Sequence, residues 1–332
     1  MLFVELSPEY ISRTGSEEYL TGVPVPMDAE SVGTSDGISV SSVVINMARI
    51  IGGDPYFVYA DKYISFIKFT AGENAVPMII SEGARSADSG DLKDACMLFR
   101  AALRIEPKSR DALYLYARAC KEIYETEADS SEDGMGDGEK IGMFKAESTE
   151  SFELLTMIHP DFALGYYFLG YAYLNMGLYL KAKLTWQEFL DHSSGSEMEI
   201  NESDNDIIPA LRDEIIGMIE ELDGPVEIER GCNMIMSGDY QGGKEVLDGF
   251  RAGKYENWWP LWYYLGMSES ALGHKDEAAE CYKKVLRLSP ANTDAMEELA
   301  AIYALSGDEV NAAKYRNKIE IVRHNLEEEL DQ

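Results

Sequence analysis

Positive charge is scarce in this sequence. The 332 residues include 29 Lys and Arg against 60 Asp and Glu, which gives a formal net charge of −31 and an isoelectric point near 4.4. A polyanion gains no counterion release from nucleic acid and is repelled by anionic lipid surfaces. The composition therefore excludes nucleic acid and acidic membranes as main partners.

Cysteine and long apolar runs are also scarce. The four cysteines lie far apart and form no CxxC motif, so we expect reduced, packed thiols with neither a disulfide nor a metal site. No stretch approaches the roughly 18 uncharged apolar residues of a membrane span, which predicts no membrane insertion. The first nine residues lack the basic segment of a secretory signal. Together these features predict a cytoplasmic protein.

Catalytic motifs are missing as well. The histidines show no HxxxH or HExxH spacing, and there is neither a GxxxxGK[ST] phosphate loop nor a GxSxG nucleophile elbow. An acidic, glycine-rich stretch partly fits a calcium loop that starts at Asp129, but Lys140 replaces the bidentate glutamate at position twelve. We therefore expect no catalysis, no cofactor and no bound metal.

The sequence does contain an internal repeat. Small residues in its last third recur 34 residues later, as shown by the pairs Gly266/Ala300, Gly273/Gly307 and Ala278/Ala312. The same register continues upstream through small, aromatic and proline positions, namely Gly83, Gly90, Ala95, Phe99 and Pro107, then Tyr166, Gly170, Gly177, Ala182 and Trp186.

This spacing resembles the tetratricopeptide repeat family, whose unit is two antiparallel helices. The resemblance implies an all-α fold, a right-handed superhelix of stacked antiparallel helix pairs. Small residues let helix backbones approach closely, while aromatic residues such as Trp186 and Tyr282 are expected to fill the space between neighbouring pairs. Pro107, Pro160 and Pro290 should end second helices, because proline cannot continue the hydrogen-bond ladder.

Departures from the period locate two insertions. Ala117 and Gly170 are 53 residues apart, 19 more than one period, which places an acidic insertion near 125–140 and predicts a solvated loop there. A second excess, of 27 residues, separates Gly170 from Gly231. It predicts that residues 197–223 form an acidic loop followed by an extra helix.

The remaining segments complete the domain organisation. Residues 1–37 contain three prolines and many serines and glycines, so we expect an irregular N-terminal arm. Residues 38–75 follow helical spacing and predict a helical hairpin, either a diverged repeat or a cap, although alternation around Phe66 also permits strands. Residues 76–196 and 224–332 hold the repeats, and the second block ends in an acidic tail.

The resemblance also implies where a ligand would bind. In this family the first helices line a concave groove through their second, fifth, ninth and twelfth positions. Tyrosine there buries a large area and keeps a hydroxyl for hydrogen bonding, and the nearby basic residues can accept a carboxylate. The alternative is that these side chains pack between units. The expected groove residues are Tyr114, Arg118, Lys121, Tyr167, Tyr171, Ile228, Tyr263 and Met267, with Glu297 in the last unit.

We therefore predict a non-catalytic scaffold or adaptor that binds an apolar or basic protein or peptide segment in this groove. Two alternatives stay open. One is an enzyme or regulatory subunit whose active part lies in residues 1–75, and the other is a structural module that self-associates. The sequence assigns neither the partner's identity nor an oligomeric state.

Overall fold

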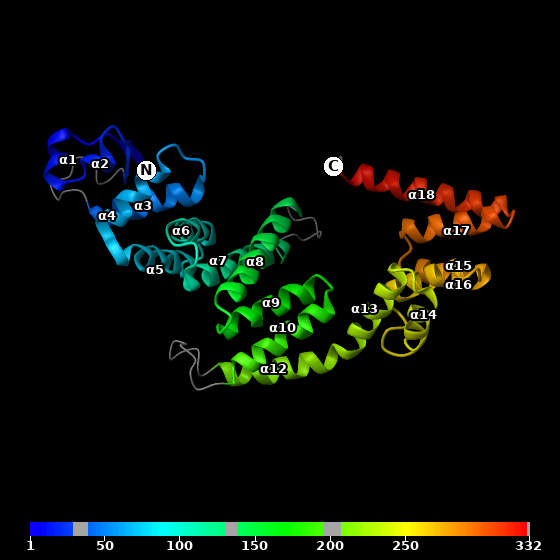
Figure 1. Ribbon diagram of the computed structural model, residues 1–332. Coiled ribbons are helices and arrows are strands. Elements are labelled where there is room, and N and C mark those ends of the chain that lie inside the picture. Colours follow the sequence, from blue (N-terminus) through cyan, green and yellow to red (C-terminus); the bar gives the residue numbers. More distant parts are fainter. Residues whose placement is uncertain (29–38, 130–137, 195–206, 331–332) are drawn as a thin grey trace. The chain divides into compact units, whose positions relative to one another are not determined.

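The computed structural model describes residues 1–28, 39–129, 138–194 and 207–330. Contacts divide the chain into two compact units, the first with residues 1–172 and 184–208 and the second with residues 173–183 and 209–332. Helices dominate both units (Figure 1), which confirms the predicted all-α helical-repeat fold.

The elements follow the chain in order. The first unit contains β1 Leu2–Val4, α1 Pro8–Thr14, α2 Glu17–Leu20, β2 Val25–Met27, α3 Val40–Gly53, α4 Ala60–Ala71, α5 Ala75–Asp88, α6 Leu92–Ile105, α7 Arg110–Asp129 and α8 Gly138–Ile158. Helices α9 Ala163–Asn175 and α10 Tyr179–His192 are divided between the two units. The chain continues with α12 Ile208–Glu221, α13 Asp223–Met236, α14 Tyr240–Asp248, α15 Trp259–Ala271, α16 Lys275–Leu288, α17 Thr293–Leu305 and α18 Glu309–Leu330.

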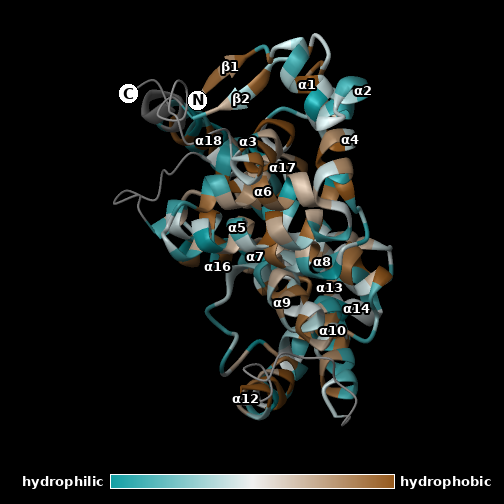
Figure 2. Cartoon of the chain, turned by 90° about the vertical axis from the view of Figure 1, so that its left-hand side faces the viewer, coloured by the Kyte–Doolittle hydropathy of each residue, from teal (hydrophilic) through white to brown (hydrophobic). Residues whose placement is uncertain are grey.

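Residues 1–28 form short regular elements, so the expected irregular arm is wrong for this part of the chain. Strands β1 and β2 pair antiparallel with Phe3 opposite Pro26, and both are coloured hydrophobic beside α1 in Figure 2. The prolines are compatible with this structure, because Pro8 begins a helix and Pro26 lies in a two-stranded ribbon. Residues 29–37 of the predicted arm lie outside the described part of the chain.

Residues 38–75 are helical, so the strand alternative is wrong. The buried side chains of α4 include Tyr63, Phe66 and Ile67, which share one face of a helix and explain the short alternating pattern. Helix α3 packs chiefly against α6 and also contacts α4 and β2. The α3 and α4 helices are therefore attached to the first repeat rather than forming an isolated hairpin.

Within the repeats, glycines of first helices face large side chains of second helices, as in the pairs Gly83–Phe99, Gly170–Trp186 and Gly266–Tyr282. A Cβ added at Gly266 would lie 2.8 Å from a ring carbon of Tyr282. These contacts extend the expectation that the aromatics fill the space between neighbouring pairs. Each ring also fills the space inside its own pair, because glycine leaves room for it.

The turns inside the pairs use glycine in the left-handed region. Their φ angles run from +73° to +96°, at Gly90, Gly177, Gly238, Gly273 and Gly307. In three of these turns the next residue is aspartate, which caps the second helix. The carboxylate of Asp239, for example, accepts a hydrogen bond of 3.0 Å from the backbone N–H of Gly242.

Prolines follow the ends of the second helices, as predicted. Helices α6, α8 and α16 end at Ile105, Ile158 and Leu288, each two residues before a proline. Hydrophobic residues run along one side of individual helices in Figure 2, as expected for helices that pack on one face. Among the described residues, none of the helices combines the length and the apolar character needed to cross a bilayer.

The acidic insertion near 125–140 is partly helical, which corrects the predicted loop. Helices α7 and α8 have 20 and 21 residues, whereas α5 and α6 have 14 each. Lys140 of α8 forms an ion pair with Glu127 of α7. Glutamate, lysine and alanine favour continuation of a helix that has already formed. The structure does not describe residues 130–137 of this insertion.

The second insertion was predicted to contain an acidic loop and an extra helix. Its acidic loop, residues 197–206, lies outside the described residues, and α12 lies where the extra helix was predicted.

Candidate functional site

The eight predicted groove residues fall into two sets, one in each compact unit. Tyr114, Arg118 and Lys121 lie on α7, and Tyr167 and Tyr171 lie on α9, within the first unit. The second unit holds Ile228 on α13, with Tyr263 and Met267 on α15.

Arg118 and Tyr114 belong to an aromatic surface of the first unit. The Tyr114 ring lies 5.1 Å from Phe162 and 5.9 Å from Phe168, measured between centroids. The exposed Arg118 guanidinium lies 5.5 Å from the ring centroids of both Tyr114 and Phe168. Cation–π contacts therefore hold this charge over the rings, and within the described part of the chain no carboxylate lies within ion-pair distance of it.

Lys121 differs from Arg118 in having a partner. Its ammonium donates to both carboxylate oxygens of Glu125, one turn further along α7, at 2.6 and 2.5 Å. This pair holds the lysine charge close to its own helix. Lys121 is therefore less suited to bind a partner's carboxylate than the sequence predicts.

Tyr167 and Tyr171 pack against the second helix of their own pair. The Tyr167 ring lies 5.6 Å from Phe189, and the Tyr171 ring lies 4.9 Å from Trp186 in an edge-to-face contact. The Trp186 indole N–H donates to the Tyr167 carbonyl oxygen at 3.1 Å. Both tyrosines remain half-buried, so each combines a packing contact with a surface-facing part.

Two of the second unit's predicted residues contribute to its core. Ile228 is only 1% exposed and lies in a cluster with Ile235, Leu247 and Leu261. Met267 is half-buried against the same cluster. The structure therefore places Ile228 in the core instead of on a ligand-accessible surface, because the first helix of this pair turns that position toward α14 and α15.

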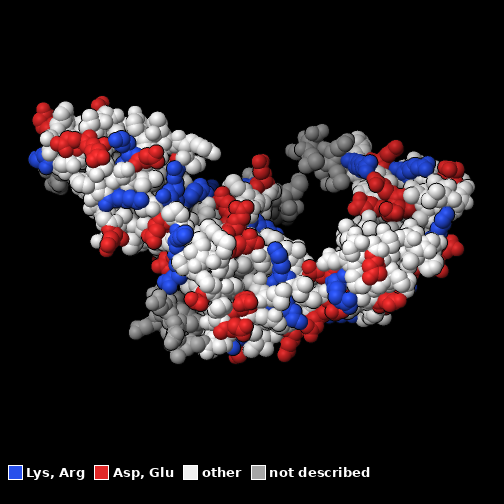
Figure 3. Space-filling model, in the orientation of Figure 1, with Lys and Arg blue, Asp and Glu red and all other residues white. Residues whose placement is uncertain are grey.

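Tyr263 lies among acidic residues of α17. Burial raises the pKa of the Tyr263 hydroxyl, and the nearby carboxylates of Asp294, Glu298 and Glu297 raise it further. Burial, Glu297 and Asp294 also raise the pKa of Glu298. We name these four residues the acidic face. Figure 3 shows acidic side chains gathered over the start of α17.

The acidic face contains one internal ion pair. A guanidinium nitrogen of Arg323, from α18, lies 2.6 Å from a carboxylate oxygen of Glu297. Both side chains stay exposed, at 61% and 53%. One arginine therefore offsets part of a charge of three carboxylates. From the sequence we expect Tyr263 and Glu297 to line the groove. Asp294 and Glu298 are not among the expected residues, although Asp294 occupies the second of the four groove-facing positions of its repeat.

Two charged clusters outside these surfaces are structural. The Arg100 guanidinium, from α6, donates to the Tyr116 hydroxyl at 3.0 Å and pairs with Glu147 of α8 at 3.3 Å. Glu269 of α15 is 4% exposed and has three basic neighbours, Lys244, Arg251 and His274, at 3.5, 3.3 and 2.8 Å. The first cluster joins α6, α7 and α8, and the second joins α15 to α14 and to the segments that follow α14 and precede α16. Both satisfy partly buried charge.

The four cysteines are buried, free thiols. Contact with Cys96, at 3.9 Å between sulfur atoms, and burial raise the pKa of Cys120 well above its usual range. Burial raises the pKa of Cys232 to about 12 and that of Cys281 to about 11. Thiols that stay protonated are poor nucleophiles and poor metal ligands.

The side chains that the structure describes include many carboxylates but few histidines and cysteines close to them. No group of three or more His, Cys, Asp or Glu there is arranged to hold a metal ion. Most of the candidate calcium loop, residues 130–137, lies outside the described residues.

Comparisons with known proteins agree with the repeat pattern. A family model described as Tetratricopeptide repeat matches residues 259–292, the segment of α15 and α16. No curated protein matches the sequence.

Several solved structures are similar in arrangement. A tetratricopeptide repeat protein from Parabacteroides merdae shares 14% identity over 85% of this chain and 93% of that chain, with a TM-score of 0.32. YrrB, described as a TPR protein with an unusual peptide-binding site, shares 15% identity over 77% and 91%, with a TM-score of 0.27. The pilF protein of Pseudomonas aeruginosa shares 14% identity over 77% and 98%, with a TM-score of 0.33. Similarity at this level carries no information about function.

Proposed function

We propose that this chain, whose residues 259–292 match the tetratricopeptide repeat model, is a non-catalytic scaffold that binds a basic protein segment on the acidic face of α15 and α17. The observation that carries the proposal is the set of three carboxylates beside the half-buried ring of Tyr263. Arginine and lysine satisfy both features, since they pair with carboxylates and stack on aromatic rings.

The overall charge supports the same partner. With a net charge of −31, the protein attracts basic segments at long range and repels acidic ones. The local carboxylates of Asp294, Glu297 and Glu298 then add short-range recognition. Burial and the carboxylates of Glu297 and Asp294 raise the pKa of Glu298, and a bound cation would favour its charged form.

The aromatic surface of the first unit is a second contact region in this proposal. Arg118 over Tyr114 and Phe168 suits an aromatic side chain or a carboxylate of a protein partner. Tyr167 and Tyr171 offer partly exposed rings.

Free, buried thiols are typical of a reducing compartment, and they support a cytoplasmic location as part of the proposal.

The test neutralises two carboxylates of the acidic face. Fluorescence anisotropy would follow a labelled hexa-arginine peptide, with hexa-glutamate as its counterpart, on the full chain and on Glu297→Gln/Glu298→Gln. We expect about tenfold weaker binding of hexa-arginine, since two partly exposed ion pairs contribute up to about 1 kcal/mol each.

The matched control is Glu309→Gln/Glu320→Gln, which removes the same charge from exposed positions of α18. It should change the affinity less than twofold. Equal losses in both double variants, or equal affinity for hexa-glutamate, would show that the acidic face is not the binding surface.

A further inference from the structure

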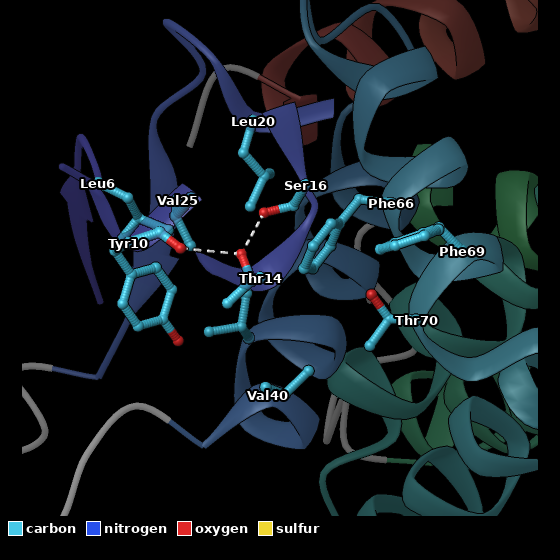
Figure 4. Close-up of a pocket in the computed structure, with 11 residues that line it drawn as sticks. Leu6, Tyr10, Thr14, Ser16, Leu20, Val25, Val40, Phe66, Phe69 and Thr70 are labelled. Atoms are coloured by element: carbon cyan, nitrogen blue, oxygen red, sulfur yellow. Dashed lines mark hydrogen bonds between the residues drawn. The ribbon is translucent and has the colours of Figure 1, made fainter. Parts of the chain in front are cut away.

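The N-terminal cavity of the first unit is mostly apolar but selects no occupant. It has a volume of about 340 Å³ and lies between α1 and α2 on one side and α3 and α4 on the other (Figure 4). Exposed Lys68 adjoins the lining residue Phe69, and the Lys62 ammonium donates to the Glu18 carbonyl oxygen at 2.7 Å. Glu17 and Glu18 of α2 are exposed as well. Because charges of both signs surround this cavity, its electrostatics favour no class of ligand.

A more specific feature, a buried hydroxyl, lies beside the acidic face of the second unit. Tyr282 of α16 is fully buried. Among the buried side-chain oxygen and nitrogen atoms of the described residues, only the Tyr282 hydroxyl lacks a hydrogen-bond partner. A polar group that leaves water without gaining a hydrogen bond destabilises the folded chain, so each such group in a protein calls for an explanation.

The hydroxyl end of the Tyr282 ring lies against α15. Ring atoms Cε1 and Cζ lie 2.8 and 2.9 Å from the position that a Cβ would take at Gly266, and Cζ carries the hydroxyl. Gly266 follows Tyr263 by about one helical turn, and the rings of Tyr263 and Tyr282 meet edge to face with centroids 5.7 Å apart. From α17, the charge of Glu298 raises the pKa of Tyr282. The hydroxyl therefore lies beside two half-buried residues of the acidic face, Tyr263 and Glu298.

The charges around this hydroxyl are negative. Burial, Glu298, Tyr263 and Cys281 raise the pKa of Tyr282, and none of these groups is basic. Arg323 pairs with Glu297 at 2.6 Å. Within the described part of the chain, neither Asp294 nor Glu298 has an ion-pair partner. A cation is therefore the ligand that these surroundings favour.

A guanidinium fits these groups better than an ammonium does. Its five N–H donors lie in one plane, so it can donate to the Tyr282 oxygen and to a Glu298 carboxylate oxygen while its face lies on the Tyr263 ring. It is also more weakly hydrated than an ammonium and loses less on entering a half-buried site. A metal ion fits less well, since no group of three or more potential ligands among the described residues is arranged to hold one.

We propose that the Tyr282 hydroxyl makes the acidic face selective for arginine over lysine in the bound segment. An arginine side chain of the partner enters between Tyr263 and Glu298 and supplies the hydrogen bond that the hydroxyl lacks. The hydroxyl is covered in the unbound chain, so these two side chains shift to admit the guanidinium, as side chains commonly do at interfaces. This inference rests on the proposed function and adds to it a residue that determines specificity.

The experiment compares labelled hexa-arginine with hexa-lysine by fluorescence anisotropy, on the full chain and on Tyr282→Phe. The unchanged chain should bind hexa-arginine about tenfold more tightly than hexa-lysine. Tyr282→Phe removes only the hydroxyl, so it should reduce this preference to less than about threefold, chiefly by weakening hexa-arginine binding. An unchanged preference in Tyr282→Phe would overturn the proposal.

Thermal stability separates recognition from packing. Because the Tyr282 hydroxyl has no partner among the described residues, Tyr282→Phe should raise the melting temperature or leave it unchanged. Tyr315→Phe is the matched control, since Tyr315 of α18 is 8% exposed and its charged neighbours are Lys283 and Glu280. It should change the affinity for either peptide less than twofold. A lower melting temperature in Tyr282→Phe, with equal losses for both peptides, would indicate a packing role and overturn the proposal.

The arginine selectivity and the proposed function fail separately. If the two peptides bind equally and Glu297→Gln/Glu298→Gln weakens both, the acidic face binds cations without selectivity, and only the role of Tyr282 is overturned. If Glu297→Gln/Glu298→Gln weakens neither peptide, the proposed function is overturned and this inference with it.

Discussion

At the residue scale, the contact between a glycine and a large side chain determines how closely two helices approach. Gly266 on α15 touches Tyr282 on α16, whose ring is fully buried. The 34-residue register already singled out both positions. It did not reveal that they touch each other, because the register gives spacing along the chain and not which faces meet.

Gly266→Ala should be destabilising. The added Cβ would lie 2.8 Å from the Tyr282 ring, so the pair of helices must separate or the ring must move. We expect a loss of about 1–3 kcal/mol in the free energy of unfolding, measured by urea denaturation.

Gly217→Ala on α12 is the control for this change. No atom lies within 4 Å of its added Cβ, so the higher helix propensity of alanine should stabilise by about 1 kcal/mol or leave stability unchanged. If both variants lost similar amounts of stability, the cause would be the replacement of a helical glycine and not the contact with Tyr282.

Glu298→Gln should raise the melting temperature at neutral pH. Burial and the neighbouring carboxylates of Glu297 and Asp294 raise the folded-state pKa above 4.5, so the folded protein binds this proton more tightly than the unfolded chain does. The stability linked to this group is present in full at low pH and is lost as the pH rises through the folded pKa.

The gain from Glu298→Gln should therefore be largest near pH 7.5 and shrink as the pH falls toward 5, in melts followed by circular dichroism. Glu320→Gln, at an exposed position of α18, controls for a general effect of removing one negative charge. A gain that grows on acidification would contradict the reasoning.

At the scale of the element, the turn between paired helices combines a left-handed glycine with a capping aspartate. Asp239 follows Gly238 and accepts a hydrogen bond from the Gly242 N–H. Asp239→Ala should lower the free energy of unfolding by about 1 kcal/mol, because α14 loses a cap. Asp239→Asn keeps an acceptor in place and should lose less than half as much. Equal losses would assign the effect to charge and not to the cap.

Helix ends were more predictable than helix lengths. Prolines fixed the ends of α6, α8 and α16, since the physical cause is local to the backbone. The loop predicted for residues 125–140 was too long, because glycines and carboxylates near residue 134 indicated a loop on both sides of that residue. The extended helices α7 and α8 stabilise each other through contacts such as the ion pair between Lys140 and Glu127. The residue pattern of one helix does not reveal its contacts with another helix.

At the scale of the whole molecule, repeats contact their neighbours in the chain, so a local defect should stay local. Gly83→Ala disturbs a Phe99 contact in the first unit, whereas Gly266→Ala disturbs the second unit. Hydrogen exchange followed by mass spectrometry should show faster exchange in α5 and α6 for the first variant and in α15 and α16 for the second. Faster exchange across both units in either variant would contradict this independence.

The candidate site was only partly predictable. The family resemblance placed Tyr263 and Glu297 correctly on neighbouring first helices, and the structure added Asp294 and Glu298 to them. The family resemblance could not distinguish exposed positions from buried ones, so the predicted groove included Ile228, which lies in the core. The N-terminal cavity had no sequence signal, because its walls come from short elements whose pairing depends on distant segments.

The buried cysteines have a practical consequence for labelling chemistry. All four native thiols are covered, and those of Cys120, Cys232 and Cys281 hold their protons at neutral pH. Maleimides react with exposed thiolates, so a cysteine introduced at the exposed Val58 would react far faster than any native one. A fluorophore or spin label can therefore be attached at one chosen site while every native cysteine stays in place.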